Sequence, residues 1–288
     1  MDALIAEARK KYHRALVDAC VLTISNDGIA SNADSSNAPS KAIAEAIAKE
    51  LGAQVGIKIK GQTSGTLFEQ ITMQFVSDTF PLLQHLRPGK WTVINLGNQN
   101  AIKTSDFAQY EHLAYLAKLM DENRQLTTML GNGYMVAPDV VVYRDLYEDQ
   151  EINKDEIYIS DSTCTMADLR KKNGGKPILH ASISAKWTMR SDRAQNSRTE
   201  ALNLIRNRKG NLPHIVVVTG EPLPSRLASL ALGTGDLDCV YHFALYELLD
   251  AAREYGKHGR EDIIESLENL IDGKRLKDIS DLPLDLCV

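Results

Sequence analysis

The stretch from residue 178 to residue 209 constrains the fold of this chain more than any other. Its first nine residues, Ile178 to Lys186, read ILHASISAK, in which polar and apolar side chains alternate. Alternation with a period of two is typical of a β-strand with one apolar and one polar face. The polar face would carry His180, Ser182, Ser184 and Lys186. We therefore predict a strand whose polar face, ending in a lysine, points toward chemistry or solvent.

A helix is expected directly after this strand. Ser191 and Asp192 are good N-cap residues, and the segment that follows has helix-forming composition up to Gly210, a typical helix stop. Arg193 and Glu200 are seven residues apart, so they share one helix face about two turns from each other. The lysine, the acid and the arginines between them would form one polar surface.

The remaining segments indicate an α/β fold, because expected strands alternate with expected helices. Further strands are predicted at 139–143, 214–219 and 238–243, and helices at 2–18, 42–51, 66–80, 106–130, 244–255 and 261–272. Polar loops are predicted at 25–40 and at 61–65, the latter reading GQTSG. A chain of 288 residues suits one large domain or two small ones, and either buries a substantial core.

Charge is unevenly distributed along the chain. The formal net charge is -5, so the overall composition gives no indication of a nucleic-acid partner. Residues 186–209, however, hold seven basic and two acidic side chains, a local balance of +5. A basic patch on an acidic protein favours a localised polyanion site. The alternative, a solvated helix face, is equally compatible with charge alone.

The cysteine pattern and the hydropathy indicate the cellular compartment that we expect for the protein. The four cysteines are scattered, with no C-x-x-C pair, which argues against a zinc ribbon or a disulfide framework and fits a reducing cytoplasm. No apolar run reaches membrane-spanning length, and the start of the chain reads as a charged amphipathic helix rather than a signal peptide. We expect a cytoplasmic bacterial protein with no membrane partner.

Three polar residues suggest a phosphodiesterase site. Asp139 follows Pro138 at the head of one predicted strand, and Lys186 ends another, so the two would meet if those strands are neighbours. Glu200 can supply a second carboxylate. Phosphodiester hydrolysis needs a metal at the phosphate, an activated water and a nearby cation, and Mg²⁺ prefers oxygen ligands. Taken singly, these residues are also compatible with an N-cap, a surface lysine and a solvated glutamate.

In their order, the pieces P-D, S-x-K and E resemble the PD-(D/E)xK nuclease superfamily. The serine before the lysine marks the variant whose acidic role moves to a glutamate on the next helix, which belongs to the type II restriction endonucleases that read a CCGG core. The matching stretches include SNAD-SN (31–37), GQTSG-FE (61–69), PD (138–139), HASIS-KWT-RSDRAQN (180–196), LNL-RNRKG-LPHIVVVT (202–219), ALGTG-DCVYHFALYEL (231–248) and DGKRLKDISDLPLDL (272–286). The resemblance therefore covers essentially the whole chain.

This resemblance implies a single restriction-endonuclease-like domain over residues 1–288, with a central mixed β-sheet flanked by helices. The implied catalytic residues are Asp139, Ser184, Lys186 and Glu200, with Glu69 as an additional acid. Mg²⁺ would be held by Asp139, Glu200 and the backbone carbonyl of Ala185. The family has a cysteine where this chain has Ala185, and only the carbonyl is needed. Lys186 would stabilise transition-state charge or orient the attacking water.

Base recognition follows from hydrogen-bond chemistry and from the resemblance. Arginine suits the O6 and N7 acceptors of guanine, and a carboxylate accepts from the N4 amino group of cytosine. Arg190, Asp192 and Arg193 therefore form a reader for a CC/GG half-site, with a simple helix cap and solvated arginines as the alternative. The resemblance adds Asp34 and Arg226 at the outer G·C pair, and Gln62 and Ser36 near the minor groove.

The sequence thus predicts a Mg²⁺-dependent type II restriction endonuclease that cuts double-stranded DNA at GCCGGC, as G/CCGGC. The resemblance implies a homotetramer that holds two DNA sites, and a palindrome requires at least two-fold-related subunits. One alternative is a sequence-specific DNA-binding protein that has lost cleavage, which would lack Asp139, Lys186 or Glu200. Another is a structure-selective PD-(D/E)xK repair nuclease, which would not need the reader at 190–193.

Overall fold

A mixed β-sheet lies at the centre of the chain. The computed structural model describes residues 3–56, 59–96, 103–130, 138–189, 191–232, 235–257 and 259–288. Its strands are β1 (Trp91–Asn95), β2 (Val140–Arg144), β3 (Ile178–Lys186), β4 (His214–Thr219), β5 (Cys239–His242) and β6 (Leu276–Asp278), and they neighbour one another in that order. Strand β2 pairs antiparallel with both β1 and β3, and β3 to β6 pair parallel with one another. The predicted central mixed sheet is confirmed.

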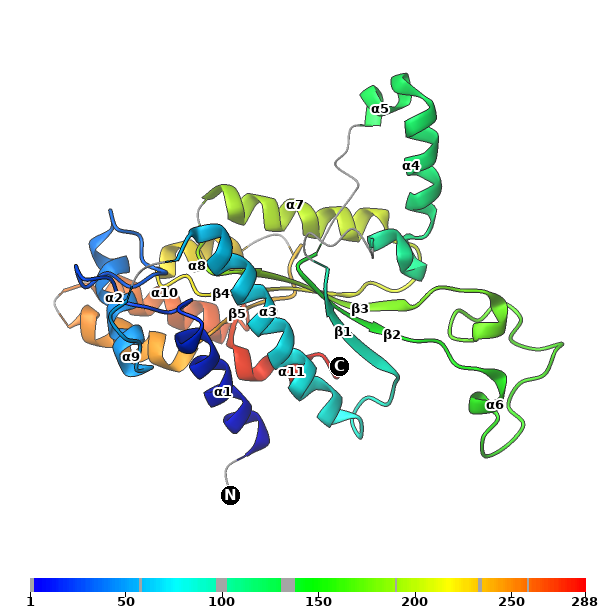
Figure 1. Cartoon of the computed structure of the whole chain (residues 1–288), viewed down its shortest axis with the longest axis horizontal. Helices are drawn as coiled ribbons and strands as arrows, with labels where there is room; N and C mark the ends of the chain where they lie inside the picture. The colour runs from blue at the N-terminus through cyan, green and yellow to red at the C-terminus, as the bar shows by residue number, and fades with distance from the viewer. Residues whose placement is uncertain are drawn as a thin grey trace.

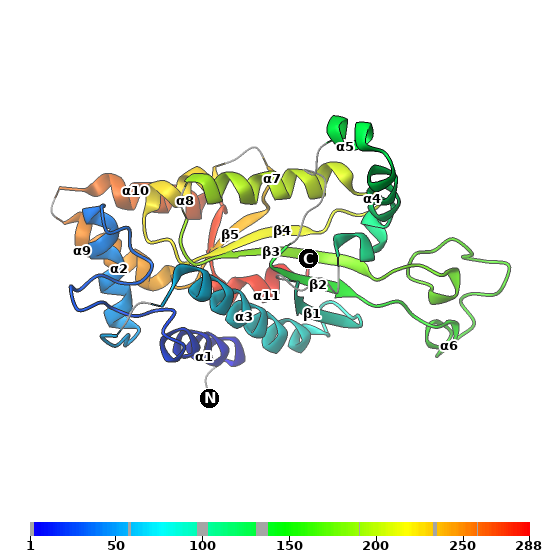
Figure 2. The same cartoon turned by 45° about the horizontal axis from the view of Figure 1, so that its top comes forward.

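Helices cover both faces of this sheet. The α-helices of the described residues are α1 (Leu4–Asp18), α2 (Ala38–Glu50), α3 (Gly61–Thr79), α4 (His112–Glu122), α5 (Arg124–Leu130), α6 (Asp149–Ile152), α7 (Ser191–Asn207), α8 (Pro224–Ala231), α9 (Leu245–Gly256), α10 (Glu261–Asp272) and α11 (Leu282–Asp285). Helices α3 and α7 lie on opposite faces, with α7 above the sheet and α3 below it in Figure 2. None of the helices described is long and apolar enough to cross a bilayer.

The sequence predicted most of these elements and missed others. Strands β3 and β4 have the predicted bounds, and helices α1, α2, α9 and α10 lie within about two to four residues of theirs. The GQTSG segment, expected as a loop, is instead the first turn of α3, so that prediction is wrong. Strands β1 and β6 were not expected, because β1 is half-exposed along its length and β6 has only three residues.

The strict alternation predicted for β3 is interrupted by a bulge. Tyr143 pairs with Leu179 and Val142 with Ala181, so one residue of β3, His180, is skipped by the ladder. An extra residue in one strand reverses the side-chain alternation beyond it. His180 accordingly stacks on Phe80, whereas Ser184 approaches α7. His180, Ser182 and Ser184 are buried and Lys186 is half-buried, which corrects the part of the prediction that allowed a solvated face.

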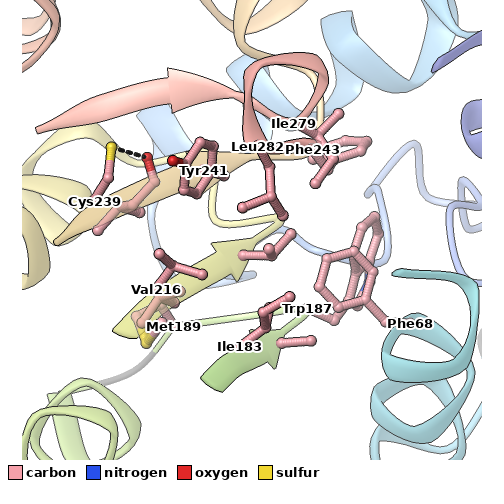
Figure 3. Close-up of a cluster of buried hydrophobic side chains, with 14 of the residues drawn as sticks. Phe68, Ile183, Trp187, Met189, Val216, Cys239, Tyr241, Phe243, Ile279 and Leu282 are labelled. Carbon is pink, nitrogen blue, oxygen red and sulfur yellow. Dashed lines mark hydrogen bonds between the residues drawn. The ribbon is translucent and has the colours of Figure 1, made fainter. Parts of the chain in front are cut away.

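An aromatic cluster fixes the end of β3. The ring of Trp187, the residue after Lys186, lies 5.1 Å from that of Phe68 on α3 and 5.1 Å from that of Phe243 (centroid distances; Figure 3). Gly220 permits this packing, because a Cβ there would lie 2.5 Å from the Trp187 ring. Buried aromatic packing of this density leaves little freedom to the backbone. The strand end that carries Lys186 is therefore rigidly held.

Candidate active site

The head of β2 lies beside the end of β3. The two strands are antiparallel, and Val140 pairs with Ile183, so Asp139 immediately before β2 faces the last residues of β3. Lys186 Nζ donates to Asp139 Oδ2 at 2.7 Å. The backbone N–H of Ala185 donates to the same oxygen at 2.8 Å. The structure thus brings Asp139 to Ala185 and Lys186, which the sequence placed on a different strand.

Ser184 links this pair to the helix above the sheet. Its Oγ donates to Asp139 Oδ2 at 3.4 Å and lies 3.4 Å from the Oγ of Ser197 on α7. Both serines are buried. Ser197 was not among the predicted site residues. A sequence signal for it exists, because it precedes Glu200 by three residues and so lies on the same helix face one turn away.

Two further carboxyl groups share the electrostatic environment of Asp139 and Lys186. Burial and then the Asp139 carboxylate raise the pKa of Glu69, on α3, to about 7, although Lys186 opposes the shift. Burial also raises the pKa of Glu200, on α7, while Lys186 opposes and Asp139 adds to that shift. Carboxyl groups from opposite faces of the sheet therefore interact electrostatically with Asp139 and Lys186, at the ends of β2 and β3.

The donor set suits a hard divalent cation. Every hydrogen bond that the side-chain carboxylate of Asp139 accepts from the described residues falls on Oδ2, which leaves Oδ1 for another ligand. Among those same residues, no three His, Cys, Asp or Glu side chains form a ready-made metal cluster. Mg²⁺ binds proteins through one or two carboxylates and completes its shell with water and phosphate oxygens, so two acids and a carbonyl fit it.

The backbone of Lys186 is held from the neighbouring strand. Thr219 Oγ1 donates to the carbonyl of Lys186 at 2.8 Å, and the N–H of Gly220 donates to it at 3.3 Å. Parallel pairing of Lys186 with Thr219 places these donors there. The orientation of the lysine is thus set by two strands and by the packing of Trp187.

The predicted inner reader falls largely outside what the structure describes. Arg190 lies outside the described residues. Asp192 and Arg193 belong to the first turn of α7, but their side chains are not among those described either. Helix α7 begins at Ser191, so Ser191 and Asp192 lie inside the helix rather than before it, and the predicted N-cap at one of them is wrong.

The predicted outer reader does come together. Arg226, on α8, donates from Nη2 to Asp34 Oδ2, although 192 residues separate them. The backbone N–H and the Oγ of Ser36 donate to Asp34 Oδ1 at 3.0 and 2.6 Å. These Ser36 bonds, and then the Arg226 guanidinium, hold the pKa of Asp34 well below its usual range. Gln62 is exposed in the first turn of α3, with no bond to this trio among the described residues.

The mixed sheet, with an aspartate before one strand and a lysine at the end of its antiparallel neighbour, defines a restriction-endonuclease-like nuclease fold. Comparison with known proteins specifies the family. Residues 12–288 match the family model of the NgoMIV restriction enzyme. The chain is also 50% identical over 289 residues to the type II restriction enzyme NgoMIV of Neisseria gonorrhoeae, across the full length of both proteins. The chain belongs to the NgoMIV restriction enzyme family, and it is a type II site-specific endonuclease.

Proposed function

We propose that this endonuclease cleaves double-stranded DNA at GCCGGC, between the first G and the first C, by Mg²⁺-dependent phosphodiester hydrolysis. The contact between Lys186 and Asp139, with Glu69 and Glu200 in the same electrostatic environment, is the observation that carries the proposal. Restriction endonucleases generally use a divalent metal. Mg²⁺ is the proposed one, because every candidate ligand is an oxygen.

In the proposed mechanism, Asp139, Glu200 and the Ala185 carbonyl hold the cation. When bound, Mg²⁺ supplies positive charge at the phosphate and lowers the pKa of water. Lys186 Nζ, positioned by Asp139, presents a cation to the charge that develops on the phosphate oxygens. The carboxyl of Glu69, with a pKa of about 7, can accept a proton near neutral pH, so it is placed to take one from the attacking water. Ser184 keeps the strand aligned with α7.

Specificity is proposed to come from two sets of side chains. Arg226 would bind the guanine of the outer pair and Asp34 the amino group of its cytosine, a pairing that their chemistry supports. Gln62 and Ser36 would approach the minor groove. Arg190, Asp192 and Arg193 would read the CCGG core. Sequence-specific cleavage then requires both sets of side chains to contact their base pairs.

We also propose a homotetramer that holds two DNA sites. An arm between β2 and β3, residues 145–177, projects from the body in both views (Figures 1 and 2). It carries exposed large apolar side chains: Ile157 is 87% exposed and Met166 91% exposed. Apolar side chains gathered on a projection favour burial against another protein surface. The same arm of another protomer is the proposed partner.

Two further proposals concern the whole chain. The chain is proposed to form one domain over residues 1–288, because a single hydrophobic core cluster extends from Tyr12 on α1 to Leu286 near the C-terminus. The bacterial cytoplasm is the proposed location. Free thiols at all four cysteines, two of them exposed, fit a reducing compartment.

Digestion of a plasmid that carries GCCGGC, with and without Mg²⁺, tests the proposal. Discrete fragments that appear only with Mg²⁺, and whose sequenced ends read G/CCGGC, are the expected result. Specific binding without cleavage would indicate the DNA-binding alternative. Nicking independent of the site would indicate a repair-type nuclease.

A further inference from the structure

Glu221 is a buried carboxylate with no role in the mechanism described so far. It lies two residues beyond β4, in the loop that leads to α8, and its exposed fraction is 0%. Burial raises its pKa, while the hydrogen bond from Met189 and the charge of Arg226 oppose that shift. A buried carboxyl group is costly unless hydrogen bonds or an ion pair compensate it. The groups that bond to the Glu221 carboxylate therefore indicate its structural role.

Those partners belong to two different elements. Glu221 Oε2 accepts from the backbone N–H of Met189 at 3.0 Å, and Oε1 accepts from the N–H of Leu223 at 3.1 Å. Met189 is two residues before the start of α7, and Leu223 is the residue before the start of α8. One carboxylate thus joins the segment that enters α7 to the segment that enters α8.

Glu221 also contacts the outer reader. Arg226 Nη1 lies 3.6 Å from Glu221 Oε2, while Nη2 of the same guanidinium donates to Asp34. Because the guanidinium is planar, two carboxylates on different nitrogens fix its plane. If cytosine takes up the acceptors of Asp34 in the complex, Glu221 is the acid that still orients Arg226.

The loop that carries Asp34 is tied to the same place. Asn32, only 1% exposed, donates from Nδ2 to the carbonyl of Gly220 at 2.7 Å. Asn32 is two residues before Asp34, and Gly220 is the residue before Glu221. Both halves of the outer reader are therefore connected to the loop that holds Glu221.

We infer that Glu221 is a specificity-determining positioning residue, which orients Arg226 toward the outer G·C pair and couples it to the entry of α7. The inference rests on the proposed function. It predicts that loss of the Glu221 charge impairs discrimination at the outer base pair, rather than cleavage in general.

The test compares Glu221→Gln with Glu247→Gln. Glu247 is a matched control, because it is also buried and also paired with an arginine, accepting from Arg9 Nη1 at 2.8 Å, but it lies on α9 and has no bond to Asp34, Glu221 or Arg226 among the described residues. The kcat/KM of each protein is measured on duplexes that contain GCCGGC or ACCGGT, which differ only in the outer pair. The ratio of kcat/KM on GCCGGC to kcat/KM on ACCGGT should fall by about 10-fold or more in Glu221→Gln. In Glu247→Gln this ratio should stay at the wild-type value.

A purely structural role would lower activity on both duplexes equally. An unchanged ratio in Glu221→Gln would therefore overturn the inference. If Glu221→Gln does not fold, as judged by its melting curve, Glu221→Asp is assayed on the same duplexes. Aspartate keeps the charge but has a shorter side chain, which does not reach Arg226 as glutamate does. A lowered ratio in Glu221→Asp supports the inference, and an unchanged ratio overturns it. If wild-type protein itself fails to prefer GCCGGC, the proposed target is wrong and the inference falls with it, a result that is visible before any variant is made.

Discussion

The ammonium group of Lys186 lies 2.7 Å from Oδ2 of Asp139, at the point where the end of β3 meets the head of β2. The two side chains are 22% and 15% exposed. Partial removal from water strengthens their attraction, and it makes the loss of either partner costly for the other. This ion pair therefore fixes the position of both groups before DNA or metal arrives.

Replacing Asp139 should separate cleavage from binding. Asp139→Ala removes the Oδ1 and Oδ2 acceptors that are proposed to hold the cation, so we expect no detectable cleavage of GCCGGC DNA. Binding of that DNA, measured by gel shift without metal, should remain close to the wild-type level. Asp145→Ala is the matched control, because Asp145 directly follows β2 at the opposite end of the strand, where Thr92 donates to it. Wild-type cutting by Asp139→Ala would remove the metal assignment.

Replacing Lys186 should slow the chemical step. Removing a group that stabilises transition-state charge lowers kcat by about 10²- to 10³-fold. We expect Lys186→Ala to lose activity on that scale in single-turnover cleavage at saturating enzyme. Lys277→Ala is a suitable control, since Lys277 also lies on a strand and also pairs with an aspartate, Asp285, at 2.6 Å. Equal losses in both variants would show an effect on folding rather than on catalysis.

The sequence could predict this site because the chemistry lies at the ends of strongly patterned elements. The apolar run after Asp139 and the alternation before Lys186 each define a strand, and Glu200 follows on a helix of clear composition. The meeting of the two strands required only that they be neighbours. The glutamate on α3, Glu69, has no such local signal and came from family resemblance.

What the sequence could not predict depends on contacts between distant segments. The bulge at His180 is visible only in the pairing of β2 with β3. The GQTSG segment has loop-like composition but forms the start of α3, because tertiary context outweighs its weak helix propensity. Glu221 directly precedes the segment from Pro222 to Pro224, whose composition is typical of an exposed loop, yet its carboxylate is buried and bonds to Met189 and Arg226. Burial of this kind is not encoded in a local pattern.

The raised pKa of Glu69 predicts a dependence of stability on pH. Its pKa in the folded, metal-free protein is about 7, against 4.5 ordinarily, so the folded state binds the proton more tightly than the unfolded state. The contribution of this group to stability is therefore full below pH 4.5 and is lost as pH rises through 7. Glu69→Gln should accordingly exceed the wild type in free energy of unfolding by about 1–2 kcal/mol at pH 8, after allowance for partial exposure, and differ little near pH 4.5.

Denaturant unfolding at both pH values, without divalent metal, measures this difference. Glu268→Gln, at an exposed acid on α10, controls for the loss of one negative charge. If the two variants follow the same pH profile, the carboxyl of Glu69 is not perturbed by its burial beside Asp139. Glu69→Gln should also lose cleavage activity, because the amide cannot accept a proton from water.

The inner reader can be tested by affinity. Arg190→Ala should weaken gel-shift binding to GCCGGC by about 1–3 kcal/mol, since it removes a bidentate contact to guanine. Arg198→Ala is the control on α7, because Arg198 donates from Nε to Asp236 at 2.9 Å and is engaged within the protein. Unchanged affinity in Arg190→Ala would remove this arginine from the reader.

The projecting arm makes the proposed assembly testable. Ile157 and Met166 are 87% and 91% exposed, and burial of such side chains in a protein interface is what favours association. The double variant Ile157→Ser, Met166→Ser should therefore elute with half the mass of the wild type in size exclusion with light scattering. Leu4→Ser, at an exposed leucine on α1, should leave the mass unchanged. On a plasmid with two GCCGGC sites, a dimer cannot bridge both sites, so the double variant should lose any preference for two-site over one-site plasmid. A variant that keeps both the wild-type mass and that preference would place the interface between dimers elsewhere on the molecule.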